Sequence, residues 1–249
     1  MATVAGNGDG DDRSAQVRAW VAERAVSRGV PVSVRLLCET AGARLAVSGV
    51  ALTVDTAGWP ELRCSTDVLG EWLAELHVTV GEGPCVDAQR TGGPVLAGDL
   101  DGSASQRRWP LFAPAAVEAG AGALFALPLV VGTIRLGVLA LHRVVAGQLP
   151  PAILADSLAF ADVALRLLVD EQAGLPAGNG DPAGEGWPLY SPQVHQATGM
   201  ISAQLGVGMD EAFVRLRARA FADRRRLAEL AADVVARRLR FDPTGEEAS

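Results

Sequence analysis

The sequence contains no lysine, so all 22 of its basic residues are arginines; they face 29 acidic residues, and the formal net charge is −7. Without lysine the chain cannot form a P-loop, because that loop uses a lysine to contact the phosphates of a nucleotide. Histidine is also scarce: the three residues, His77, His142 and His195, do not stand beside a serine or cysteine in a nucleophile motif. We therefore predict that the chain is not an enzyme.

Cysteine is limited to Cys38, Cys64 and Cys85, which form no Cys-x-x-Cys pair and have no neighbouring histidine. The spacing of a metal site is therefore absent. We predict three buried thiols, as is usual in a reducing compartment. Cys85 follows Gly83 and Pro84 at a predicted helix start, where a thiolate is stabilised, and is the candidate for a redox role.

Long apolar runs are lacking. The longest, residues 121–131, contains glycine and proline and is shorter than the roughly 20 residues that a membrane span needs. The first 13 residues have no apolar core of the kind found in a secretory signal. With 249 residues, 49% hydrophobic and 20% charged, we expect a globular cytoplasmic protein without a membrane segment.

Charge is distributed unevenly. Residues 187–241 carry nine arginines and five acidic residues, or +4, whereas the remainder carries 13 arginines and 24 acidic residues, or −11. Arg215 and Arg219 share one helical face, and residues 224–226 are three consecutive arginines. A basic segment on an acidic protein favours a polyanionic partner, but solvated arginines on a helical bundle would give the same count.

The same basic segment contains three amphipathic stretches. Apolar residues recur every three or four positions from 190 to 205, from 209 to 220 and from 227 to 235, and glycines 206 and 208 separate the first two stretches. Isolated helices shorter than roughly 12–15 residues are marginal in water. We therefore predict three helices that cover one another, within a domain at residues 188–241.

The preceding chain alternates between strand and helix patterns. We predict a disordered tail at residues 1–12, and a helix at 13–30 that packs either on the next domain or on a second copy of itself. Strands are predicted at 49–54, 62–65, 94–97, 121–130 and 134–142, the last two joined by a hairpin at Gly132 and Thr133. Residues 31–172 are therefore predicted to be an α+β domain with a largely antiparallel sheet. A Gly/Pro-rich linker at 173–187 and an acidic tail at 242–249 complete the division.

The carboxyl-terminal motifs resemble a known family. The run Val-His-Gln-Ala-Thr-Gly-Met-Ile at 194–201 is followed by Asp-Glu-Ala at 210–212 and by Leu216 and Arg217. Together these motifs are similar to the ANTAR domain, a three-helix RNA-binding module of bacterial antitermination regulators. Many members carry lysine at the position of Thr198 and arginine at that of Pro192. The resemblance implies RNA contact, which we assign to Thr198, Arg215, Arg219, Arg224 and Arg225.

The α+β region resembles a second family. The run Gly-Glu-Gly-Pro-Cys-Val-Asp-Ala at 81–88 and the run Arg-Trp-Pro-Leu-Phe-Ala at 108–113 look like the type of GAF domain that precedes ANTAR modules. GAF domains are small-molecule sensors without one common ligand, so the resemblance leaves the identity of any ligand or cofactor unknown. We assign ligand contact to Glu82, Cys85, Asp87 and Trp109.

Two functions follow from these patterns. The first is a sensory transcription regulator, in which the GAF-like domain controls dimerisation of an ANTAR module that binds paired RNA leader hairpins and promotes antitermination. This hypothesis requires guanidinium groups that are not locked onto neighbouring carboxylates. The alternative is a ligand- or redox-responsive interaction protein whose carboxyl-terminal bundle docks on a protein partner.

Overall fold

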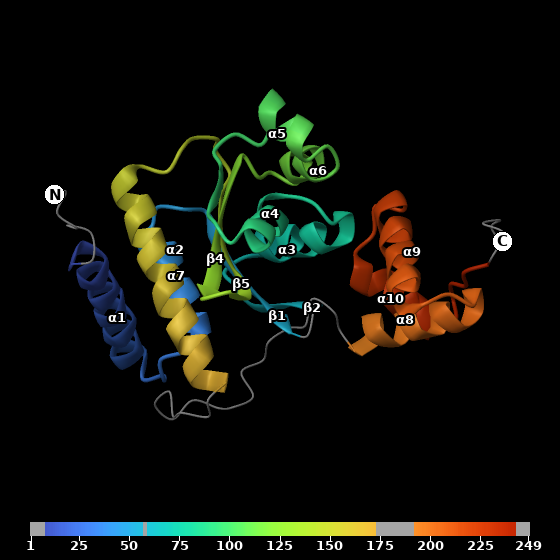
Figure 1. The fold of residues 1–249 in the computed structure, drawn as a ribbon, viewed down its shortest axis with the longest axis horizontal. Coiled ribbons are helices and arrows are strands. Elements are labelled where there is room, and N and C mark those ends of the chain that lie inside the picture. Colours follow the sequence, from blue (N-terminus) through green and yellow to red (C-terminus); the bar gives the residue numbers. More distant parts are fainter. Residues whose placement is uncertain (1–7, 57–58, 173–191, 243–249) are drawn as a thin grey trace.

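The computed structural model describes residues 8–56, 59–172 and 192–242, which form an α+β domain (residues 8–172) and a helical bundle (residues 192–242) (Figure 1). The elements of the α+β domain are α1 (Gly8–Arg28), α2 (Val34–Arg44), β1 (Gly49–Thr56), β2 (Trp59–Ser65), α3 (Val68–Val80), α4 (Pro84–Thr91), β3 (Val95–Ala97), α5 (Ser103–Arg108), α6 (Phe112–Glu118), β4 (Ala123–Val131), β5 (Ile134–Arg143) and α7 (Pro151–Gln172). Those of the bundle are α8 (Pro192–Leu205), α9 (Met209–Ala222) and α10 (Leu227–Val235).

The sheet is antiparallel throughout, with strand order β2-β1-β5-β4-β3. Successive side chains of a strand point to opposite faces, so Phe125 and Leu127 of β4 enter one core and Leu124 and Ala126 enter the other. Helices α1, α2 and α7 cover the first face, and α3, α4 and α6 cover the second (Figure 1). The predicted α+β class and the β4–β5 hairpin are confirmed.

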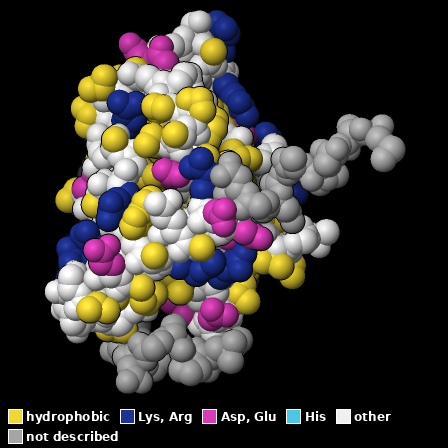
Figure 2. Space-filling view, turned by 90° about the vertical axis from the view of Figure 1, so that its left-hand side faces the viewer, with side chains coloured by type: hydrophobic (Ala, Val, Ile, Leu, Met, Phe, Trp, Pro, Cys, Tyr) yellow, Lys and Arg dark blue, Asp and Glu magenta, His cyan; other side chains and the backbone are white. Residues whose placement is uncertain are grey.

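Helix α1 packs on its own domain. Val17, Val21 and Ala25 are buried, and the Trp20 ring stacks on Phe160 of α7 with centroids 6.2 Å apart. The helix starts at Gly8, so residues 8–12, which we predicted to be part of a tail, are helical; residues 1–7 lie outside the described residues. The outer face of α1 and α7 mixes hydrophobic, basic and acidic side chains (Figure 2).

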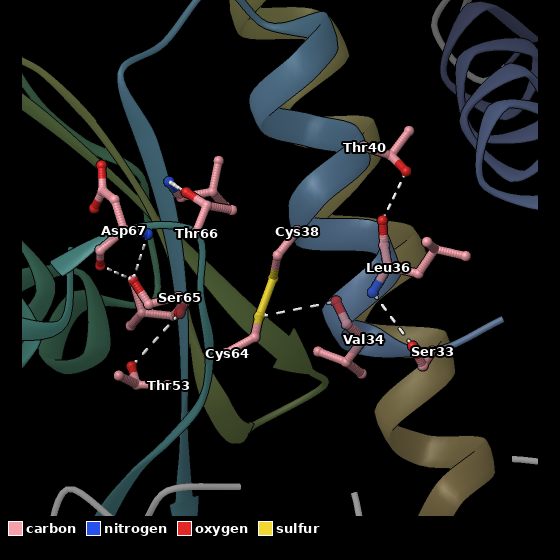
Figure 3. Close-up of a disulfide and its surroundings, with 12 residues drawn as sticks. Ser33, Val34, Leu36, Cys38, Thr40, Thr53, Cys64, Ser65, Thr66 and Asp67 are labelled. Carbon is pink, nitrogen blue, oxygen red and sulfur yellow. Dashed lines mark hydrogen bonds between the residues drawn. A yellow bond between two sulfur atoms is a disulfide. The ribbon is translucent and has the colours of Figure 1, made fainter. Parts of the chain in front are cut away.

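Two of the three cysteines are bonded to each other. Cys38 of α2 and Cys64 of β2 form a disulfide across 26 residues of chain, with their Cα atoms 6.9 Å apart (Figure 3). The prediction of free thiols was therefore wrong for this pair. Helix α2 packs against β2, and this packing brings together two positions whose sequence spacing carries no pairing signal.

The bundle has a small core in which α8, α9 and α10 cover one another, as predicted. Gly206 adopts φ +66° and ends α8, and Gly208 precedes α9. Helix α10 ends at Val235, where the third predicted apolar stretch also ends, and Tyr190 and the linker 173–187 lie outside the described residues. The fully or almost fully buried residues are Val194, Ala197, Ile201, Ala212, Leu216, Ala220, Leu227, Leu230, Ala231 and Val234.

None of the helices in the described ranges combines the length and the apolar character that crossing a bilayer requires.

Candidate nucleic-acid interface

The two predicted contact residues on α9 form ion pairs within their own helix. Arg215 Nη2 lies 2.9 Å from Glu211 Oε1, and Arg219 Nε lies 2.8 Å from Asp223 Oδ2. Both pairs join residues four apart, which face the same side of a helix. Exposed pairs of this kind contribute about 0–1 kcal/mol, so an incoming phosphate can displace the carboxylate at low cost.

The two predicted contact residues in the α9–α10 turn also have acidic neighbours. Arg224, whose side chain is 85% exposed, lies 3.8 Å from Glu118 of α6. Arg225 donates to Asp233 at 2.6 Å, and this hydrogen bond raises the pKa of Arg225 and lowers that of Asp233. All four predicted arginines thus have a carboxylate within ion-pair distance.

Part of the cationic surface is not paired. Arg237 and Arg240 are exposed at the end of the bundle and make no ion pair with any residue of the described ranges. Guanidinium groups that are not locked onto carboxylates are therefore present at these two positions. In the exposed ion pairs, the carboxylate holds its arginine only weakly.

Thr198 does not reach the surface. Its side chain is fully buried, and its hydroxyl donates to the Val194 carbonyl at 2.7 Å, one turn earlier on α8. In this conformation Thr198 exposes no group that RNA could contact. We therefore leave Thr198 out of the proposed contacts.

The bundle contacts the α+β domain through α3, a contact that no sequence pattern predicted. Arg226 Nε donates to Glu75 Oε2 at 2.8 Å, and the backbone N–H of Ala228 donates to Glu75 Oε1 at 3.4 Å. Arg217 Nε donates to the Thr79 carbonyl at 2.9 Å, and Val78 packs against the core of the bundle. Charge counts cannot identify such partners, because 138 or more residues separate them in the chain.

A cavity of about 720 Å³ lies between the sheet, α3, α4 and α9. Its walls are mainly apolar, with Leu73 and Val138 among the lining residues, and Phe213 and Arg217 of α9 also line it. The volume falls within the range of roughly 300–1,000 Å³ that small-molecule sites occupy. Of the four residues that we predicted to bind a ligand, only Cys85 lines this cavity.

The other three predicted ligand residues make structural hydrogen bonds. Glu82 accepts the backbone N–H groups of Leu111 and Phe112 at 2.6 and 3.0 Å, which satisfies donors at the start of α6. Asp87 accepts from the buried Trp109 indole at 3.1 Å, and Arg90 and Arg108 also donate to Asp87. These contacts join α4 to α5 and α6, and no contribution to the cavity wall is seen for Glu82, Asp87 or Trp109.

Cys85 is a protonated thiol beside a neutral histidine. Burial raises the pKa of Cys85 to about 12, which is opposite to the thiolate stabilisation expected at a helix start. His77 Nδ1 donates to the Leu73 carbonyl at 2.7 Å, so Nε2 is the acceptor for the Cys85 N–H at 3.2 Å. Burial lowers the pKa of His77 to about 4. Among the described residues no cluster of three or more His, Cys, Asp or Glu side chains is suited to hold a metal ion.

The cysteine environments predict a specific pattern of thiol reactivity. With a pKa of about 12 in place of 9.0, Cys85 should hold roughly 10³-fold less thiolate at pH 8 than an ordinary thiol, and should react more slowly with an aromatic disulfide reagent. Protein that is unfolded without a reductant should show one reactive thiol per chain. Protein that is unfolded and reduced should show three. A fast thiol in native protein, or three thiols without reductant, would contradict this assignment.

Residues 191–235 match the family model of the ANTAR domain. The chain is also similar to the solved GAF domain of a phosphoenolpyruvate-protein phosphotransferase from Coxiella burnetii, with 13% identity, coverage of 65% of this chain and 97% of that one, and a TM-score of 0.46. The corresponding GAF domain from Acinetobacter gives 10% identity, 70% and 98% coverage and a TM-score of 0.49. The GAF-B domain of DevS from Mycobacterium smegmatis gives 20% identity, 57% and 96% coverage and a TM-score of 0.40. No curated protein sequence matches the chain.

The three-helix core and the family match fall on the same segment, which lies within the basic stretch of residues 187–241. The chain therefore carries an ANTAR domain at residues 191–235, behind an α+β domain that is similar to GAF domains.

Proposed function

We propose that this protein is a sensory transcription regulator whose α+β domain controls RNA binding by the ANTAR domain, and that the bound RNA hairpins favour antitermination. The observation that carries the proposal is the ANTAR match at residues 191–235, within a segment, residues 187–241, that carries +4 in a chain whose remainder carries −11. Arginines neutralise RNA phosphates, so the basic segment provides the electrostatic part of binding. Arg215, Arg219, Arg224 and Arg225 remain the proposed contacts.

The proposal includes a small-molecule signal and a dimer. The 720 Å³ cavity is the proposed ligand site, since its apolar walls and its few polar groups are typical of such sites. Because Phe213 and Arg217 line this cavity, a ligand there would contact the ANTAR domain directly. Two copies of the chain would hold paired hairpins, and light scattering at several protein concentrations measures that assembly.

RNA binding should depend steeply on salt and on the α9 arginines. The probe is a two-hairpin leader RNA recovered by crosslinking in cells, titrated by gel shift at several salt concentrations. Each phosphate contact contributes roughly 0.7 to the log–log slope on single-stranded RNA, so Arg215→Ala and Arg219→Ala should each lower the slope by about that amount. Arg18→Ala, which removes an exposed arginine from the distant helix α1, is the matched control. Absence of RNA binding at low salt would refute the proposal.

A second function is favoured by exposed apolar residues on α9. Met209, Val214 and Phe221 are 40%, 57% and 38% exposed. Such residues fit a bundle that docks on a protein partner. A pull-down from lysate before and after RNase separates the two functions, because a protein partner remains bound after the RNA is digested.

A further inference from the structure

A second cleft, of about 620 Å³, lies between the ANTAR domain and the outer side of α3 and α6. One wall carries the consecutive arginines 224–226 of the α9–α10 turn, and the other carries Glu75 and Glu118. Charges of opposite sign thus face each other across the domain contact. A cleft of this volume has the size of a small-molecule pocket and cannot admit an RNA hairpin.

Glu75 is the residue that joins the two walls most closely. Its side chain is only 9% exposed, and both carboxylate oxygens are used: Oε2 by Arg226 Nε, and Oε1 by the backbone N–H of Ala228. The hydrogen bond to Glu75 raises the pKa of Arg226 above its ordinary value. By contrast, the carboxylates that pair with Arg215 and Arg224 are 53% and 75% exposed. Breaking the Glu75 pair without a substitute would leave a mostly buried charge unpaired, which is costly.

The donors around Glu75 are those that also bind a phosphate. A guanidinium group and a backbone N–H at the start of a helix both donate to anionic oxygens. The N-cap residue Arg226 makes no side-chain hydrogen bond to the first turn of α10, and the Ala228 N–H of that turn donates to the α+β domain. In this conformation the partner is the carboxylate of Glu75.

We propose that Arg226 and the first turn of α10 form an RNA phosphate site, and that Glu75 occupies this site when the ANTAR domain is docked on α3. The inference rests on the proposed RNA-binding function and adds its regulation. RNA and the sensor domain compete for the same donors, so the docked protein binds RNA weakly. Undocking also frees Arg217 from the Thr79 carbonyl, and Arg217 lines the proposed ligand cavity.

The test compares two substitutions on α3 in the full-length protein, with the two-hairpin RNA described above. Glu75→Gln keeps the shape of the side chain and removes the charge that holds Arg226, and should tighten RNA binding on the order of tenfold, a usual size for coupling between two sites. Glu71→Gln is the matched control, because Glu71 lies one turn earlier on α3 and acts on Arg226 through charge alone. It should change the affinity by less than about twofold.

Two further measurements identify the site. Arg226→Ala should weaken RNA binding, and Glu75→Gln should tighten binding less in that background than in the parent, since the guanidinium group that it releases is absent. Hydrogen exchange at the Ala228 amide, measured without RNA, should be faster in Glu75→Gln than in the parent or in Glu71→Gln. Protection of the other α10 amides at the level of the parent, in the same measurement, would show that the variant remains folded and has undocked.

The failures can be distinguished. Equal RNA affinity of the parent and Glu75→Gln, with RNA binding intact, would overturn the competition and leave the proposed function standing. An equal gain in RNA affinity in Glu75→Gln and Glu71→Gln would show that only the general loss of negative charge matters. That result would also overturn the competition. Absence of RNA binding in every variant would remove the proposed function and this inference with it.

Discussion

Leu230→Ala should unfold the ANTAR domain and leave the α+β domain folded. Leu230 is completely buried in the bundle core, where four of the ten buried residues are alanines. Truncation of a buried leucine costs about 2–5 kcal/mol through lost burial and the cavity left behind. Three helices of 14, 14 and 9 residues have few other large apolar contacts that could compensate.

Hydrogen exchange resolved by segment measures this result. Exchange across α8, α9 and α10 should increase strongly in Leu230→Ala, while the strands of the sheet keep the protection of the parent protein. Val214→Ala is the matched control, because Val214 lies on α9 with 57% of its surface exposed and should change stability by no more than about 0.5 kcal/mol. Equal exchange in the two variants would contradict the observed packing.

Acidification should destabilise the α+β domain by about 3 kcal/mol between pH 7 and pH 4 through His77 alone. Burial lowers the pKa of His77 to about 4, from 6.5 in the unfolded chain. Between these values the unfolded state binds more protons than the folded state, so the stability contribution is complete above pH 6.5 and is lost as the pH falls toward 4. His142 acts in the same direction, because burial lowers its pKa although Asp67 opposes the shift.

The free energy of unfolding, measured in urea at a series of pH values, checks this prediction. His77→Gln should be less stable than the parent at pH 7, since the hydrogen bonds to the Leu73 carbonyl and the Cys85 N–H are disturbed. Its stability should nevertheless fall less steeply between pH 6.5 and pH 4. A variant with the same slope as the parent would show that His77 is not the group that titrates.

The arginine pairs differ in what they imply for RNA binding. Arg215 and Arg219 pair with exposed carboxylates on their own helix, and such pairs are weak enough for a phosphate to replace the acid. Arg226 pairs with a carboxylate that the α+β domain holds at 9% exposure. In the proposed competition, domain docking, rather than the local pairs on α9, is therefore the feature that opposes RNA binding.

The sequence by itself determined the elements and the domain order. Apolar residues at spacings of three and four located α8, α9 and α10, because a helix buries one stripe of side chains. The hairpin was predicted from Gly132 and Thr133 between two apolar strands, and Gly132 adopts φ +60° in that turn. These signals are local, since each depends on residues that lie within a few positions of one another.

Only the tertiary structure decided the partners of the polar and reactive side chains. The Cys38–Cys64 bond, the hydrogen bonds of Glu82 to the start of α6 and the contact of Glu75 with Arg226 join residues 26, 29 or 30, and 151 positions apart. Composition and periodicity do not encode such pairings, because they depend on which faces the packed helices and strands present to one another. For the same reason Thr198, which the family motif placed among the RNA contacts, lies inside the bundle, and Arg226 lies at the contact between the two domains.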